Sequence, residues 1–85
     1  MNAWVIAVGS ELLTPFRVDT NSLLITERLN TIGFTVSQKT VLGDDVDRLV
    51  ALLLQALPSA DVVICTGGLG PTADDVTRDA VARAL

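Results

Sequence analysis

The sequence contains no histidine and only one cysteine, Cys65. Without histidine, the chain cannot form a Ser-His-Asp triad around Ser10, or a zinc site built on histidine and several cysteines. One cysteine cannot form a disulfide within the chain. Because Cys65 lies in an apolar run, we expect a buried core thiol and neither a nucleophile nor a metal ligand.

Basic residues and long apolar stretches are also scarce. The 6 Lys and Arg residues against 10 Asp and Glu residues argue against a nucleic-acid-binding surface, but not against a small anionic ligand. The chain has no segment of membrane-spanning length, and its N-terminus lacks a basic region followed by a long apolar stretch. We therefore expect no membrane contact and a cytoplasmic location. The 85 residues, 49% of them hydrophobic, predict one small domain over residues 1–85.

Three segments have the composition of parallel strands. Residues 3–8 are almost entirely apolar, as in a strand that is covered on both faces. Residues 61–65 form a second short continuous apolar run, which predicts a fully buried strand. Residues 34–42 mix apolar with polar side chains, so we expect a less buried strand at the edge of the sheet.

Helical patterns alternate with these strands. Asp19 and Thr20 are N-cap residue types before the first helix, and Gly33 supplies its C-terminal stop. The turn at Gly43 and Asp44 leads into the second helix, and Pro58 lies at its end. The apolar faces are predicted to hold Ile25, Leu29 and Ile32 in the first helix, Val46, Leu49, Val50, Leu53 and Leu57 in the second, and Val76, Ala80 and Ala84 in the third.

This βαβαβα pattern predicts a three-layer α/β fold with a parallel sheet in the order 2-1-3. The first and second helices must then lie on opposite faces of the sheet. The order reverses between the first and third strands, and open α/β sheets bind ligands in the crevice beyond the carboxyl ends of such strands. The topology places six residues around this crevice: Ser10, Glu11, Asp44, Asp45, Asp74 and Asp75.

The loop of residues 66–75 joins the third strand to the third helix and contains three glycines and two adjacent aspartates. Glycines and a helix N-terminus allow backbone N–H groups to approach a phosphate. Asp74 and Asp75 suit a divalent metal that bridges carboxylate to phosphate. The alternative is helix capping alone, because Thr72 and Asp75 have the spacing of a capping box. No lysine follows the glycines, which excludes a Walker-type loop.

Four motifs together resemble the N-terminal domain of the competence/damage-inducible protein CinA, which belongs to the wider molybdopterin-binding, molybdenum cofactor biosynthesis fold. They are Gly9-Ser10-Glu11-Leu12-Leu13, Asp19-Thr20-Asn21, Val41-Leu42-Gly43-Asp44-Asp45, and Thr66 through Thr77 with its Leu69-Gly70-Pro71-Thr72 core. Relatives that act on molybdopterin carry a threonine and an arginine where this chain has Leu69 and Asp74. These departures disfavour molybdenum insertion or adenylylation of molybdopterin.

The resemblance implies hydrolysis of a nucleotide diphosphate, namely an ADP-ribose pyrophosphatase that depends on Mg²⁺, Mn²⁺ or Co²⁺. A non-catalytic molybdopterin- or nucleotide-binding module is the alternative, and in either case the ligand is a small nucleotide or pterin phosphate. The implied catalytic residues are Asp44, Asp74 and Asp75, and the last two are also the implied metal ligands. The implied substrate- and phosphate-binding residues are Gly9, Ser10, Glu11, Gly67, Gly68, Gly70 and Thr72. Asn21 matches a further family position, but we expect it to support the start of the first helix. Arg17 could reach a phosphate, but we expect it to lie on the surface.

We also expect that the chain is a truncated part of a longer domain. No Gly, Asn or Pro stop signal follows the third helix, and the third strand would form an exposed sheet edge, which complete proteins usually cover or pair. The CinA resemblance agrees, since that domain continues further. The 85-residue polypeptide alone is therefore expected to be inactive and to associate with itself, and the complete protein is expected to be a homo-oligomer.

Overall fold

The computed structural model describes residues 1–67 and 71–85, with the backbone but not the side chains of residues 71–74. Three strands alternate with three α-helices, as the sequence predicts, and a short 3₁₀ helix follows the first strand. In chain order the elements are β1 (Asn2–Val8), the 3₁₀ helix η1 (Ser10–Leu13), α1 (Thr20–Thr31), β2 (Thr35–Leu42), α2 (Val46–Ser59), β3 (Val62–Gly67) and α3 (Pro71–Ala84).

The three strands are parallel and lie in the order β2-β1-β3, which confirms the predicted topology. β1 pairs with β2 from Asn2 to Val8, and its register with β2 shifts once, between Ala3 and Trp4. On its other side β1 pairs with β3 from Ala3 to Val8. Since β1 has a neighbour on both sides, its apolar sequence is explained by its central position.

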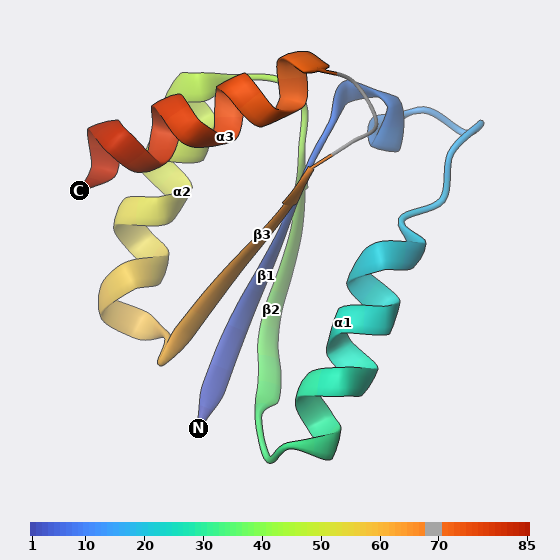
Figure 1. Ribbon diagram of the computed structural model, residues 1–85, viewed down its shortest axis with the longest axis vertical. Coiled ribbons are helices and arrows are strands. Elements are labelled where there is room, and N and C mark those ends of the chain that lie inside the picture. The colour runs from blue at the N-terminus through green and yellow to red at the C-terminus, as the bar shows by residue number, and fades with distance from the viewer. Residues whose placement is uncertain (68–70) are drawn as a thin grey trace.

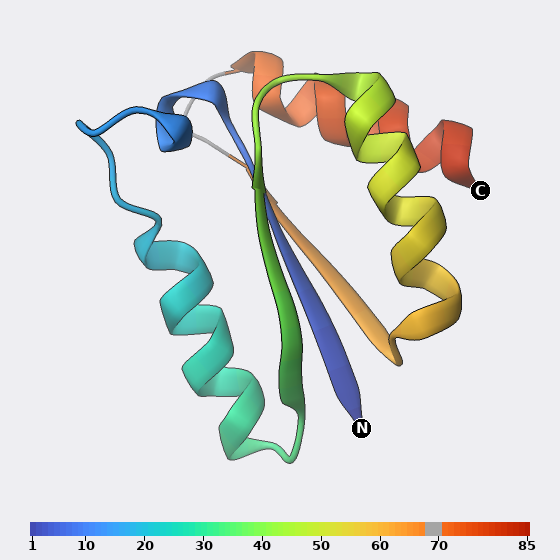
Figure 2. The ribbon, with the colours of Figure 1, turned by 180° about the vertical axis from the view of Figure 1, so that it is seen from behind.

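Helices cover both faces of the sheet, as Figure 1 shows: α1 lies on one face, and α2 and α3 lie on the other. Successive side chains of β1 alternate between these two layers. Ala3 and Val5 pack with Leu29 of α1 in one buried cluster. A second cluster contains Ile6 and Val8 of β1, Leu49 and Leu53 of α2, and Ala80 of α3. The reverse view in Figure 2 shows the same two layers.

The ends of α1 follow the predicted signals. The Asp19 carboxylate caps the helix by accepting a hydrogen bond from the Ser22 N–H at 3.1 Å. Gly33, just beyond the helix, has a φ of 92°, a left-handed conformation that favours glycine. The assignment of Ile32 to the apolar face was wrong, because its side chain is 69% exposed. Ile32 is the C-cap residue, so its backbone leaves the helical path before the side chain can reach the sheet.

The second helix confirms the core positions of Leu49 and Leu53, but Leu57 is 44% exposed and its assignment to the core was wrong. Leu57 lies in the last turn of α2, beside an apolar surface hollow of about 150 Å³ that α2, α3 and β3 share. Pro58 lies inside the last helical turn, one residue before the helix ends at Ser59.

The third strand is less buried than predicted. Every residue of β3 is half-buried, and not fully buried as its continuous apolar sequence predicts. The reason is its place at an edge of the sheet, where only β1 pairs with it. Its start is joined to β1: the Asn2 N–H donates to the Asp61 carboxylate at 2.7 Å, and the Asp61 N–H donates to the Asn2 side-chain oxygen at 3.0 Å.

None of the helices within residues 1–67 and 71–85 has the length and the apolar character needed to cross a membrane.

Two leucines of α2 test the buried cluster under α2 and α3. Leu49 is fully buried, whereas Leu54 on the same helix is 55% exposed. We expect Leu49→Ala to lower the free energy of unfolding by about 2–5 kcal/mol, because it removes transfer energy and leaves a cavity. Leu54→Ala should cost less than about 1 kcal/mol. Urea denaturation followed by circular dichroism measures both, and equal losses would contradict this packing.

Candidate functional site

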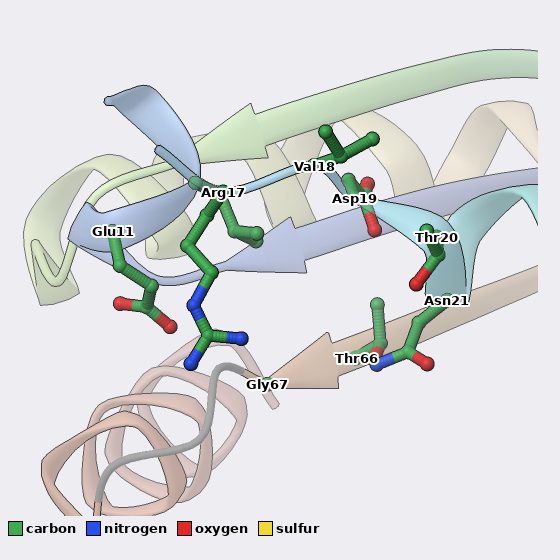
Figure 3. Close-up of a pocket in the computed structure, with 9 residues that line it drawn as sticks. Glu11, Arg17, Val18, Asp19, Thr20, Asn21, Thr66 and Gly67 are labelled. Atoms are coloured by element: carbon green, nitrogen blue, oxygen red, sulfur yellow. The ribbon is translucent and has the colours of Figure 1, made fainter. Parts of the chain in front are cut away.

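A pocket of about 200 Å³ lies beyond the carboxyl ends of β1 and β3, where the strand order reverses. Three segments line it: η1 with the loop that follows, the start of α1, and the end of β3. The lining residues are Glu11, Leu12, Arg17, Val18, Asp19, Thr20, Asn21, Thr66 and Gly67, and Figure 3 shows them. The pocket therefore lies in the crevice that the topology predicts as the ligand site of an open α/β sheet.

The pocket carries charged groups of both signs. Glu11 is half-buried and contributes a carboxylate from η1. Asp19 contributes a second carboxylate, of which one oxygen accepts the capping bond from the Ser22 N–H. Arg17 contributes a guanidinium, and Figure 3 shows its side chain extending from the loop toward the end of β3 at Gly67. A ligand in this crevice would meet two acidic groups and one basic group.

Two predicted ligand-binding residues, Gly9 and Ser10, anchor η1 to the neighbouring chain segment. The Gly9 N–H donates to the Leu42 carbonyl oxygen at 2.8 Å, which extends the pairing of β1 with β2. The Ser10 hydroxyl accepts a hydrogen bond from the Asp44 N–H at 3.1 Å. A Cβ at Gly43 would lie 3.3 Å from the Ser10 hydroxyl oxygen, closer than most such contacts. Glycine at position 43 thus allows η1 to approach this turn.

The two acidic residues of the turn after β2 have different surroundings. The Asp45 carboxylate caps α2, accepting from the Arg48 N–H at 3.2 Å, and pairs with the Arg48 side chain at 3.6 Å. Asp44 is exposed, and it does not belong to the described residues that line the crevice pocket. The structure brings the Asp44 backbone to Ser10, while its catalytic role stays a prediction.

The predicted glycine loop and acid pair are described only in part. Gly67 ends β3 and lines the pocket, whereas Gly68 and Gly70 lie outside the described residues. Thr72 lies within the first turn of α3, which begins at Pro71. The side chains of Thr72 and Asp74 lie outside the description, so their predicted roles stay predictions.

Asp75 is the member of the acid pair whose side chain is described. Its carboxylate is exposed and pairs with Arg78 one turn further along α3, at 3.4 Å. Exposed pairs of this kind contribute about 0–1 kcal/mol, so the carboxylate can exchange Arg78 for another partner at little cost. In the described part of the chain, no three acidic, cysteine or histidine side chains gather closely enough to hold a metal ion. The described donors alone therefore do not form a metal site.

Arg17 is exposed, as expected, and it also lines the pocket. Asn21, expected to support the start of α1, and Thr66, not assigned to the site, line the pocket as well. Arg17 carried a detectable signal. Residues 9–19 follow the carboxyl end of β1, and Arg17 is the only basic residue in this segment of the sequence. Cys65 packs against the cluster around Ile6 but is half-buried, so it is less buried than the predicted core thiol. Burial raises the pKa of its thiol, which disfavours the thiolate.

Comparison with known proteins supports the family assignment. Residues 4–85 match a family model described as "Probable molybdopterin binding domain". The chain belongs to this family. It is 56% identical over 85 residues to a CinA-like protein of Acidobacterium capsulatum and 55% identical to one of Solibacter usitatus. The match covers the whole chain but 20% of each relative, so the chain spans about a fifth of their length.

Two solved structures share this family fold. The crystal structure of CinA from Thermoplasma acidophilum, a protein of unknown function, matches 99% of the chain and 51% of its own length, with a TM-score of 0.89 and 39% identity. The molybdopterin biosynthesis enzyme MoaB of Thermus thermophilus matches 92% of the chain and 53% of its own length, with a TM-score of 0.71 and 23% identity. The second likeness concerns the fold alone. Together they confirm the molybdopterin-binding-like architecture and the predicted CinA resemblance.

The neighbouring acids of the β2–α2 turn give a paired test. We expect Asp45→Ala to lower the free energy of unfolding by about 1 kcal/mol, because α2 loses its cap. Asp44→Ala should cost less than about 0.5 kcal/mol, because Asp44 contributes its N–H, and not its carboxylate, to the contact with Ser10. Thermal and urea unfolding measure both variants. A larger loss for Asp44→Ala would contradict the observed cap.

Proposed function

We propose that the complete protein, to which this chain contributes a crevice at the carboxyl ends of its strands, hydrolyses a nucleotide diphosphate, with ADP-ribose as the substrate and a divalent cation as a requirement. The crevice pocket at the carboxyl ends of β1 and β3 is the observation that carries the proposal. It lies at the ligand position of open α/β sheets and is lined by charged and polar groups suited to a phosphate-bearing ligand. The similarity to CinA-like proteins supports the CinA resemblance, which implies this reaction class.

The size of the pocket supports partial enclosure of such a substrate. Pockets that enclose a whole drug-sized ligand measure about 300–1,000 Å³, whereas this pocket has a volume of about 200 Å³. It suits the diphosphate with an adjoining sugar, and the remainder of the nucleotide would extend out of the crevice.

The proposed reaction consumes one water molecule. Water attacks one phosphorus of ADP-ribose, the bridging P–O bond breaks, and AMP and ribose 5-phosphate are released. Two carboxylates of the pocket could accept the proton of that water, but one oxygen of Asp19 already accepts the capping bond from Ser22. Glu11 therefore has the freer carboxylate of the two. Because both acids repel phosphate, a cationic group must accompany them in any productive complex.

The second candidate is a binding module without catalysis, with molybdopterin or a nucleotide as its ligand. The description of the matching family as a molybdopterin-binding domain favours it. Pterin phosphates and nucleotides share the anionic phosphate that the crevice would have to accommodate. The two candidates differ in turnover, since a binding module would retain ADP-ribose or the pterin unchanged. Homo-oligomerisation of the complete protein stays a prediction.

The exposed acids of α3 test catalysis. In the purified protein with ADP-ribose and Mg²⁺, Mn²⁺ or Co²⁺, we expect Asp75→Asn to remove most AMP release, because asparagine lacks the charge that a hard cation requires. Asp79→Asn is the matched control, since Asp79 also forms an exposed ion pair on α3, with Arg83 at 3.6 Å. It should retain the unmodified activity.

Chromatographic assay of AMP, together with circular dichroism of each variant, gives the readout. Unchanged AMP release by Asp75→Asn at saturating metal would contradict the role of Asp75. Absence of AMP release from the unmodified protein, together with retained binding of ADP-ribose or a pterin phosphate, would favour the binding module.

A further inference from the structure

Arg17 occupies an unusual place among the arginines of the chain. Arg48, Arg78 and Arg83 each form an ion pair with an aspartate, at 3.6, 3.4 and 3.3 Å respectively. Arg28 lies in the last turn of α1, where a positive charge complements the helix dipole. These four arginines therefore have partners or positions that account for them within the fold.

Arg17 has no comparable structural role among the residues that the structure describes. Within residues 1–67 and 75–85, no side chain forms a hydrogen bond or ion pair with its guanidinium. Its side chain instead lines the crevice pocket and extends toward Gly67, as Figure 3 shows. Its immediate neighbours, Phe16 and Val18, are 89% and 79% exposed, so the loop is not held by burial of these side chains. With respect to the described side chains, the guanidinium is thus available to a ligand in the crevice.

The charges of the pocket indicate which ligand this would be. Glu11 and Asp19 place negative charge around the cavity, which opposes the entry of an anion, and Arg17 is the basic residue among those that line it. A guanidinium presents a planar fork of N–H donors that matches two oxygens of a phosphate. The opposing carboxylates are acceptors that suit sugar hydroxyl groups. This arrangement favours a ligand that carries a phosphate next to a polyhydroxylated group.

We propose that Arg17 is the residue that binds the phosphate of the crevice ligand, and that it does so without a metal ion. The identity of the substrate rests on the proposed function. Recognition of a phosphate by Arg17 does not depend on it. It makes Arg17 a determinant of specificity for phosphorylated over neutral ligands. A divalent cation then adds to turnover and is not the sole source of affinity.

Isothermal titration calorimetry in the presence of EDTA tests this role in the purified protein. The ligands are ADP-ribose, inorganic pyrophosphate and adenosine, which lacks phosphate. We expect Arg17→Gln to weaken binding of ADP-ribose and pyrophosphate at least tenfold and to leave any adenosine binding unchanged. Arg17→Lys keeps the positive charge but lacks the planar fork of N–H donors. Its affinity for ADP-ribose and pyrophosphate should lie between those of the unmodified protein and of Arg17→Gln. Arg28→Gln is the control, because it removes the same charge from the far end of α1. It should bind ADP-ribose and pyrophosphate with the affinity of the unmodified protein.

The outcomes separate this inference from the proposed function. If the unmodified protein cleaves ADP-ribose but Arg17→Gln binds it with unchanged affinity, the role of Arg17 is wrong and the proposed function stands. If pyrophosphate binds in an Arg17-dependent manner but ADP-ribose is never cleaved, the proposed function is wrong and the role of Arg17 stands. Failure of the unmodified protein to bind either anion in EDTA would also overturn the inference, because it would make affinity depend on the metal.

Discussion

The pairing of β1 with a parallel strand on each side is the constraint on which the rest of the structure depends. It places β1 in the middle of the sheet, where helices cover both faces, so Ala3 and Val5 face α1 while Ile6 and Val8 face α2 and α3. It also brings the carboxyl ends of β1 and β3 together while their following helices lie on opposite faces of the sheet. The gap between those two ends is the crevice. Strand order therefore sets the position of the crevice, whichever side chains surround it.

Side chains and loops then give that crevice its chemical character. The segment from η1 to the start of α1 supplies one wall, with Glu11, Arg17 and Asp19, and the end of β3 supplies the other. Asp19 has two functions at once, because it caps α1 and lines the pocket. The acidic groups make the crevice selective, since an anion can occupy it only with a compensating cation nearby. Arg17 supplies such a charge from the chain itself.

Periodicity predicted the fold because its signals arise from burial in the middle of the sheet. The apolar run of β1 and the spacing of Leu49 and Leu53 left little choice of position, and the structure confirms them. The predictions failed where tertiary context changes at an end or an edge. Ile32 has helical spacing but follows the last helical residue, and β3 has a core-like sequence but only one neighbour. The site was harder to predict, because Arg17 lies in an irregular loop, where no periodicity indicates which way a side chain points.

Asp44 and Asp45 show why residue type alone does not identify a functional carboxylate. Either could cap α2, and only the backbone geometry assigns the cap to Asp45. The Asp44 N–H donates a hydrogen bond to the Ser10 hydroxyl, and the Gly9 N–H donates one to the Leu42 carbonyl oxygen. Together these two bonds hold η1 against the end of β2. Glu11 lies within η1, so its position in the crevice depends on a strand that contributes no side chain to the pocket. The edge strand β2 and the turn after it thus support the site indirectly, through the backbone hydrogen bond from Gly9 to Leu42, the bond from the Asp44 N–H to the Ser10 hydroxyl, and the close approach that Gly43 allows.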